Sequence, residues 1–200
     1  MKITPWDQQI ARKLVVHIAQ TPITPNQLTL LSLFLAIIGG AMLTLGNMVC
    51  TNWGVGLFVL ARFLDHFDGE LARQKGMTSR FGYYLDYIAG GLSYSFLFIC
   101  LGIGFYKTEL GNWSIALAAT GAFSAIISMF TNLGLDKHLN PENDQDAVGY
   151  PGFAGFELED GIYLIAPITW AGYLLPFFIA AGICAGIYCL WTVINLFFFR

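Results

Sequence analysis

Charged residues are scarce in this sequence: Asp, Glu, Lys and Arg make up 12% of its 200 residues, and the net charge is only −3. Such a chain lacks the broad basic surface that binds nucleic acid. The four cysteines stand singly without Cys-x-x-Cys spacing, which disfavours both a cysteine-built metal cluster and a disulfide framework. Residues 1–21 are interrupted by charges and lack a continuous apolar run, so no cleavable signal peptide is expected.

Hydrophobic residues, by contrast, make up 56% of the chain, with a mean hydropathy of +0.61. This composition is typical of an integral membrane protein. Runs of spanning length predict an all-α membrane protein with six transmembrane helices, at about 25–46, 51–74, 79–106, 112–134, 156–172 and 173–199. The polar stretch 135–155, which contains Pro and Gly, is predicted to be a loop.

The first 21 residues have apolar side chains at helical spacing, at positions 6, 10, 14, 15 and 18. This pattern predicts an amphipathic helix that lies on the membrane surface. We find no repeat and no second domain. The expected organisation is therefore one domain over 1–200, with an interfacial helix at 1–21 and a six-helix bundle at 22–200.

Basic residues are distributed unevenly between the two sides of this topology. Lys107 falls on one side, whereas the other side receives Lys2, Arg12, Lys13, Arg73, Lys75, Arg80, Lys137 and Arg200. Since Lys and Arg favour the cytoplasmic side, both termini and the acidic ends of the second and third helices are predicted to be cytoplasmic. The compact chain indicates a prokaryotic inner membrane.

Acidic residues interrupt the apolar second and third helices. Asp65 and Asp68 are three apart and share a helix face, and Asp86 lies on the next helix after a short turn. If the two helices pack antiparallel, these carboxylates converge. Crowded carboxylates need cations or protons to relieve their repulsion, and Mg²⁺ or Mn²⁺ suits oxygen ligands.

Small residues and one arginine accompany these acids. Gly69 and Gly82 leave room for a ligand, and Arg73 can bind phosphate. The combination favours a diphosphate-bearing substrate and phosphoryl transfer. The alternative is that these three acids and Glu70 merely pair with Arg62 and Arg73, but two cations cannot balance four acids. We further expect Arg62 to pair with Asp65, His66 to serve packing, and Glu70 to face water.

The run Asp65-x2-Asp68-Gly69-x2-Ala72-Arg73-x8-Gly82-x3-Asp86 closely resembles the signature of the CDP-alcohol phosphotransferases, with seven fixed residues across 22 positions. The segment 24–29, TPNQLT, more weakly resembles the start of the family's first membrane helix. The resemblance implies that Asp65, Asp68 and Asp86 hold the divalent metal. It also implies a CDP-donor site made by Asp65, Gly69, Ala72, Arg73 and Gly82.

By the same resemblance, the chain would transfer a phosphoalcohol group from a CDP-linked donor, CDP-diacylglycerol for example, to an acceptor hydroxyl and release CMP. Many members of the family make phospholipids and many are homodimers. The family signature ends with a further Asp, proposed as the base that deprotonates the acceptor, but Gly90 stands at that position here.

Gly90 leaves several interpretations open. Asp86, or Glu159 and Asp160 at the start of the fifth predicted helix, could supply the base, although these last two acids also suit a helix N-terminus. The acceptor could instead need no strong base, or Gly90 could be an engineered change. A fourth alternative is a non-catalytic relative that binds nucleotide or lipid. An ion or metal transporter would explain the acids but not the spacing of Gly, Ala and Arg.

Overall fold

The computed structural model describes residues 5–108, 110–139, 152–153 and 156–198, without the side chains of 138–139, 152–153 and 156–159. The helices are α1 (Trp6–Ala19), α2 (Pro25–Leu43), α3 (Met48–Lys75), α4 (Arg80–Phe105), α5 (Asn112–Leu139), α6 (Ile165–Trp170) and α7 (Leu174–Phe198). The strands β1 (Gly152–Phe153) and β2 (Phe156–Glu157) pair antiparallel, and the 3₁₀ helix η1 (Leu158–Leu164) runs into α6.

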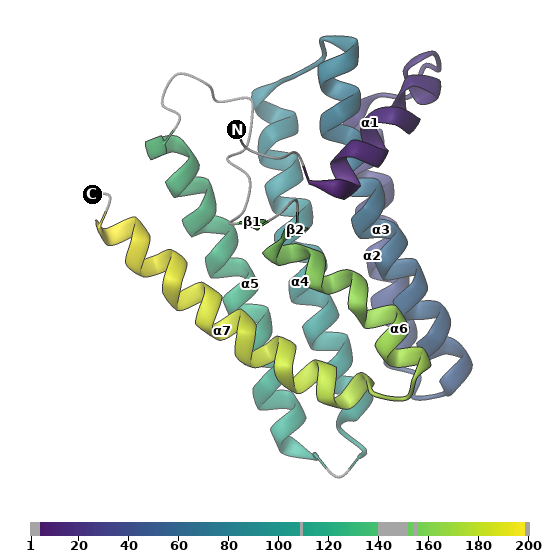
Figure 1. Ribbon diagram of the computed structural model, residues 1–200. Coiled ribbons are helices and arrows are strands. Elements are labelled where there is room, and N and C mark those ends of the chain that lie inside the picture. The colour runs from purple at the N-terminus through teal and green to yellow at the C-terminus, as the bar shows by residue number, and fades with distance from the viewer. Residues whose placement is uncertain (1–4, 109, 140–151, 154–155, 199–200) are drawn as a thin grey trace.

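The long helices form a bundle (Figure 1). Helix α2 packs on α3 and α4, α4 packs on α5, and α5 packs on α7. Helices α1 and α6 both pack on α3. Helix α3 therefore lies between the N-terminal helix and the short segment that precedes α7, and its surroundings come from distant parts of the sequence.

Five of the described helices, namely α2, α3, α4, α5 and α7, are long and apolar enough to cross a membrane. The segment predicted as a fifth spanning helix, 156–172, contains seven 3₁₀ residues and a six-residue α-helix instead. At their usual rises these residues reach about 23 Å, less than the ~30 Å hydrocarbon core. The predicted all-α membrane class is confirmed, whereas the count of six spans is not.

Local side-chain contacts explain where the site-bearing helices begin and end. Thr24 and Gln27 form a reciprocal capping box at the start of α2, and Ser79 caps α4 by accepting a hydrogen bond from the Gly82 amide at 3.0 Å. Gly76 ends α3 in the left-handed region, with φ of 63°. This turn sends α4 back along α3.

Helix α5 ends one turn later than predicted, at Leu139 rather than near residue 134. Asp136 is buried in this added turn and accepts hydrogen bonds from the hydroxyls of Tyr83 and Tyr87 on α4. These contacts anchor the end of α5 to α4. The loop predicted at 135–155 therefore begins later, and most of the rest of it lies outside the described residues.

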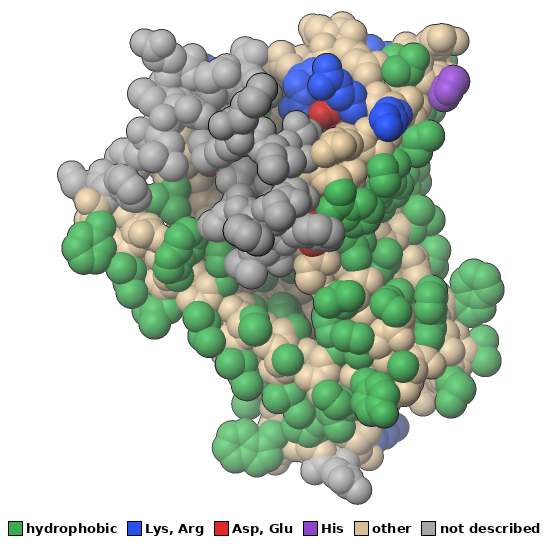
Figure 2. All heavy atoms as spheres, viewed as in Figure 1, with side chains coloured by type: hydrophobic (Ala, Val, Ile, Leu, Met, Phe, Trp, Pro, Cys, Tyr) green, Lys and Arg blue, Asp and Glu red, His purple; other side chains and the backbone are tan. Residues whose placement is uncertain are grey.

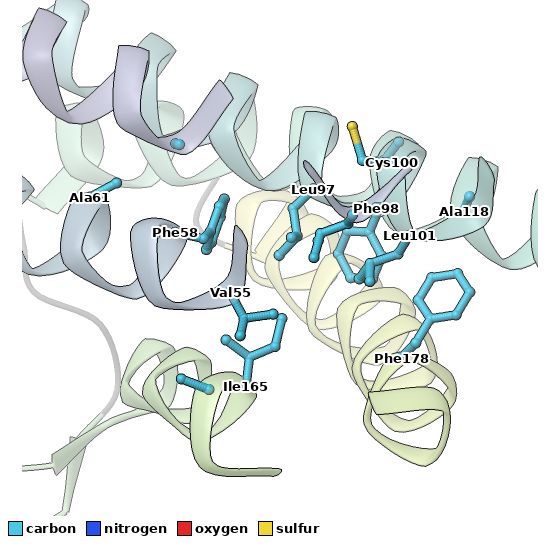
Figure 3. Packing of buried hydrophobic residues seen from close by; sticks show 14 residues of the cluster. Val55, Phe58, Ala61, Leu97, Phe98, Cys100, Leu101, Ala118, Ile165 and Phe178 are labelled. Atoms are coloured by element: carbon cyan, nitrogen blue, oxygen red, sulfur yellow. The ribbon is translucent and has the colours of Figure 1, made fainter. Parts of the chain in front are cut away.

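The main core is built from buried residues of α2, α3, α4, α5, α6 and α7. Figure 3 shows Val55 and Phe58 of α3 near Ile165, and Phe98 near Phe178 of α7. The backbones of α2 and α3 approach closely where these helices cross, because a Cβ on Gly54 would lie 2.6 Å from the carbonyl oxygen of Gly39. A methyl group at this crossing would force the two helices apart.

Many hydrophobic side chains lie on the outside of the bundle. Figure 2 shows Lys and Arg side chains gathered at the end where α1 lies, while hydrophobic side chains cover most of the remaining described surface of this face. Phe34, Trp53 and Phe130 are among these exposed residues, at 60%, 67% and 61% of their surface. An outer surface of this kind suits lipid rather than water.

Candidate metal and diphosphate site

The three aspartates predicted from the sequence come together where α3 faces α4. Carboxylate oxygens of Asp65, Asp68 and Asp86 lie within 4.8 Å of one another. Asp65 and Asp68 share one face of α3 because they are three residues apart, and the turn at Gly76 brings Asp86 back to the same level. Asp65 and Asp68 are buried, at 9% and 6% exposure, so their charges are poorly hydrated.

This donor set fits a divalent cation. Oxygens bound to one Mg²⁺ can lie up to about 4.2 Å apart, since each bond is about 2.1 Å long. Small rotations of the three carboxylates would bring their oxygens within that limit. All three candidate ligands are hard oxygen donors, which favour Mg²⁺ or Mn²⁺ over softer metals.

Two hydroxyl groups on α2 contact the carboxylates of Asp68 and Asp65. Thr29 donates a hydrogen bond to Asp68 Oδ2, and Ser32 Oγ lies 3.2 Å from Asp65 Oδ1. Both residues are buried, at 2% and 3% exposure. Such hydrogen bonds fix the orientation of a carboxylate and lower the cost of burying its charge. Sequence reasoning missed both residues, although two hydroxyls spaced three apart in an apolar helix were a usable signal.

Arg73 follows Asp68 by five residues on α3 and is held by a neighbouring acid. Its Nη2 is 2.8 Å from Glu70 Oε1, and 46% of the Arg73 side chain stays exposed. Glu70 is itself buried at 8% exposure, so the expectation that it faces water was wrong. Glu70 orients the guanidinium while leaving part of it open to a ligand.

The two glycines of the motif leave space near these polar groups. A Cβ on Gly69 would lie 3.6 Å from Arg73 Nη2, in ordinary contact with the guanidinium. A Cβ on Gly82 would lie 3.1 Å from Asn26 Oδ1, which is tighter than most such contacts. Ala72 is half-buried in the last turns of α3. Because neither glycine carries a side chain, space for a ligand remains over Gly69 and Gly82.

The histidine inside the motif binds away from the aspartates, as expected. His66 Nε2 lies 2.8 Å from Asp7 Oδ2 on α1, and the Tyr163 hydroxyl of η1 donates to the same oxygen at 3.1 Å. Burial of Asp7 acts to raise its pKa, but the hydrogen bond and charge of His66, with further hydrogen bonds from the Gln8 amide and Tyr163, lower the pKa below its usual value. Asp7 thus joins α1 to the site helix and to η1, a role that sequence reasoning missed.

Helix α1 also packs through apolar residues on the flank of the site. Ala11 and Val15 are fully buried against Leu28, Phe67 and Leu71, whereas Ile10 and Leu14 remain 40% and 47% exposed. The buried face of α1 is thus directed to the protein. Its exposed apolar residues are compatible with the predicted position at the membrane surface, which stays a prediction.

The candidate bases have different surroundings. Asp160 accepts a hydrogen bond from Trp6 Nε1 at 3.1 Å, which links η1 to α1. The side chain of Glu159 lies outside the described part of the chain. At Gly90 a Cβ would meet the Nη1 atom of Arg62 at 3.9 Å. Arg62 itself pairs with Asp65 at 3.0 Å, as the sequence predicted.

Comparison with known proteins gives this arrangement a family. The sequence profile described as CDP-alcohol phosphatidyltransferase matches residues 22–154, which is more than half of the chain and includes the three aspartates. The chain belongs to the CDP-alcohol phosphatidyltransferase family. Membership supports a transferase of phosphate-containing groups and, together with the apolar helices, an integral membrane protein.

Two curated relatives match the sequence. An archaetidylinositol phosphate synthase from Pyrococcus horikoshii is 28% identical over 187 residues, which cover 86% of this chain and 92% of that protein. An uncharacterized protein from Aquifex aeolicus is 29% identical over 124 residues, which cover 61% of this chain and 62% of that protein.

Solved structures of phosphatidylinositol phosphate synthase from Mycobacterium tuberculosis share the fold. The structure with CDP-DAG bound has a TM-score of 0.70 at 15% identity and covers 94% of both chains. The structure in complex with manganese and citrate has a TM-score of 0.58 at 18% identity, covering 96% of this chain and 88% of that one.

Proposed function

We propose that this chain transfers a phosphoalcohol group of the phosphatidyl type from a CDP-linked lipid donor to an acceptor hydroxyl, with release of CMP. The observation that carries the proposal is the convergence of Asp65, Asp68 and Asp86 beside Arg73. Buried carboxylates that suit a divalent cation, next to an arginine that suits phosphate, match the needs of a diphosphate substrate. The reaction would serve phospholipid biosynthesis.

The comparisons support a donor of this chemistry. The tuberculosis synthase that shares the fold has been solved with CDP-DAG bound, and the Pyrococcus relative is described as an archaetidylinositol phosphate synthase. Both descriptions concern phosphoalcohol chemistry on lipids. The comparisons lend no support to the alternative of a non-catalytic relative that binds nucleotide or lipid.

In the proposed reaction, the acceptor oxygen attacks the phosphorus of the donor that carries the alcohol. A new oxygen–phosphorus bond forms, the bond from that phosphorus to the bridging oxygen breaks, and CMP leaves with the bonding electron pair. The acceptor hydroxyl loses its proton. The donor phosphates would lie over Gly69 and Gly82, where a larger side chain would intrude, with Ala72 beside them and Arg73 paired to the diphosphate.

The acidic residues would have two tasks. Asp65, Asp68 and Asp86 would hold Mg²⁺ or Mn²⁺, which supplies electrostatic stabilisation for the charge that develops on the diphosphate oxygens. Asp86, Glu159 and Asp160 are the proposed candidates for accepting the proton of the acceptor hydroxyl. A general base contributes typically about 10²–10⁴-fold, so removing the residue that acts here should slow the reaction without abolishing it.

We also propose that the protein lies in a prokaryotic inner membrane with the site on the cytoplasmic side. The basic residues Arg73, Lys75 and Arg80 lie at the ends of α3 and α4 nearest the site, as the positive-inside rule expects. CDP-linked donor, acceptor alcohol and CMP would then exchange at the level of the lipid headgroups.

The experiment is CMP release by the purified protein in liposomes that contain CDP-diacylglycerol, with Mn²⁺ and a pool of acceptor alcohols. Formation of a new phospholipid, detected by mass spectrometry, identifies the acceptor. Asp160→Asn and Glu159→Gln, measured side by side, test two of the three candidate bases, since the variant that lacks the acting base should lose about 10²-fold or more in rate. Two unaffected rates would leave Asp86 as the candidate. Absence of CMP release with every acceptor and CDP-linked donor would overturn the proposal.

A further inference from the structure

Arg62 is the buried cation of the site, one helical turn before Asp65. Its exposure is 6%, and its Nη2 atom lies 3.0 Å from Asp65 Oδ2. Its Cζ atom lies 4.8 Å from the centre of the Tyr94 ring on α4, a cation–π distance. The guanidinium is therefore held from both helices that carry the aspartates.

Gly90 leaves the space that this guanidinium faces. Asp86, Gly90 and Tyr94 are spaced four apart and share one face of α4. A Cβ on Gly90 would meet Arg62 Nη1 at 3.9 Å, and no other described atom lies within 4 Å apart from its neighbours and its own helix backbone. Arg62 is therefore the described side chain that a residue larger than glycine at position 90 would contact first.

The fixed charge of Arg62 changes how many metal ions the site can neutralise. Asp65, Asp68 and Asp86 together carry three negative charges when ionised, and Arg62 carries one positive charge that it keeps at any ordinary pH. Two negative charges remain, which one divalent cation balances. A second divalent cation would leave an excess of two positive charges in a poorly hydrated site, beside a guanidinium that repels it.

The contacts of Asp65 lead to the same conclusion. Its Oδ2 faces Arg62 at 3.0 Å, and its Oδ1 faces the Ser32 hydroxyl at 3.2 Å. With both oxygens already engaged, Asp65 has less capacity to bridge two metal ions. We propose that Arg62 is a resident cation in place of a second metal ion, so that this site binds one divalent ion per chain.

This inference rests on the proposed function only in taking the three aspartates as the metal ligands. It is tested by titrating the purified full-length protein in nanodiscs with Mn²⁺ alone and counting bound ions from the loss of the free Mn²⁺ signal in electron paramagnetic resonance. The unmodified chain should bind one Mn²⁺. Two Mn²⁺ ions bound per chain with similar affinity would overturn the inference.

Two variants test whether Arg62 neutralises a carboxylate placed at position 90 and so prevents a second metal ion from binding. Gly90→Asp alone should still bind one Mn²⁺, because the added carboxylate would pair with Arg62. Gly90→Asp combined with Arg62→Ala should bind two, because the added carboxylate then has no resident cation. A single ion in that double variant, shown to be folded by its thermal unfolding, would overturn the inference. Should the double variant not fold, the count in the unmodified chain decides alone.

Arg12→Ala is the matched control, since Arg12 is exposed on α1 and its loss should leave the count at one. CMP release by the same preparation separates the inference from the proposed function. One bound ion per chain together with CMP release supports the inference and the proposed function. Two bound ions per chain together with CMP release overturn only the inference. One ion without CMP release keeps the inference and overturns the proposed transfer. No bound Mn²⁺ overturns the inference together with the proposed metal site.

Discussion

Thr29→Val removes the hydroxyl that supports Asp68 while nearly preserving the volume of a side chain that is only 2% exposed. A hydrogen bond to a charged group contributes about 1.5–3 kcal/mol, and groups that orient metal ligands typically change metal affinity by about 10–100-fold. We therefore expect Mn²⁺ to bind about 10–100-fold more weakly to the variant. The assay is the Mn²⁺ titration followed by electron paramagnetic resonance, with the Mn²⁺ dependence of CMP release as a second readout.

Thr120→Val is the control for this substitution, because the Thr120 hydroxyl donates only to a backbone carbonyl of its own exposed helix turn, Ala116 O at 3.0 Å. Ser32→Ala should have a smaller effect than Thr29→Val. The single Ser32 proton is shared between Thr29 O at 2.8 Å and Asp65 at 3.2 Å. If Thr29→Val and Thr120→Val gave the same Mn²⁺ affinity, the supporting role assigned to Thr29 would be refuted.

Three further predictions concern α1, the arginine and the helix crossing. Asp7→Asn should lower the free energy of unfolding by about 1–3 kcal/mol at neutral pH, measured by thermal unfolding. The pKa of Asp7 is lowered in the folded state, so its contribution to stability is present above the unfolded-state pKa and is lost as the pH falls through the folded-state pKa. The variant should therefore match the stability of the unmodified chain only in acid. Arg73→Lys should raise the KM for the CDP-linked donor about tenfold, since a point charge replaces a forked donor; an unchanged KM would refute the phosphate contact. Gly54→Ala should lower the unfolding temperature because its Cβ would lie 2.6 Å from a backbone oxygen, whereas Gly56→Ala, with nothing within 4 Å, should not; equal effects would contradict the close crossing.

The convergence of the aspartates could be predicted from the sequence because it depends on local geometry. Asp65 and Asp68 share a face through helical periodicity alone, and the short turn that ends at Gly76 returns the chain antiparallel. Asp86 lies in the second turn of the returning helix α4, and the rise of that helix places it level with Asp65 and Asp68. Spacing within two consecutive helices therefore carried the correct prediction.

The partners of the supporting residues were not predicted because they depend on how distant helices pack. Thr29 and Asp68 are 39 residues apart in sequence, and Asp7 and Tyr163 are 156 apart. The amphipathic pattern of the N-terminal helix shows that one face avoids water, but it does not tell whether that face meets lipid or protein. The sequence therefore did not indicate that Asp7 is buried and paired with His66.

Hydropathy was also a poor guide to the segment before α7. Residues 158–170 are apolar enough to suggest a spanning helix, yet they form a 3₁₀ helix and a short α-helix packed on α3. An apolar segment can be buried in protein as well as in lipid, so composition alone does not give its length or its hydrogen bonding. The sequence also failed to predict that Glu70 is buried and paired with Arg73.

The central claim is that Asp65, Asp68 and Asp86 form a metal-dependent site for phosphoalcohol transfer. It is tested most directly by CMP release from CDP-diacylglycerol in proteoliposomes as the Mn²⁺ concentration is raised, with Asp68→Asn beside the unmodified chain. We predict CMP release that requires Mn²⁺ or Mg²⁺ and falls by at least about 10²-fold in the variant. CMP release that persists in the presence of a chelator, or that is equal in Asp68→Asn, would contradict the account.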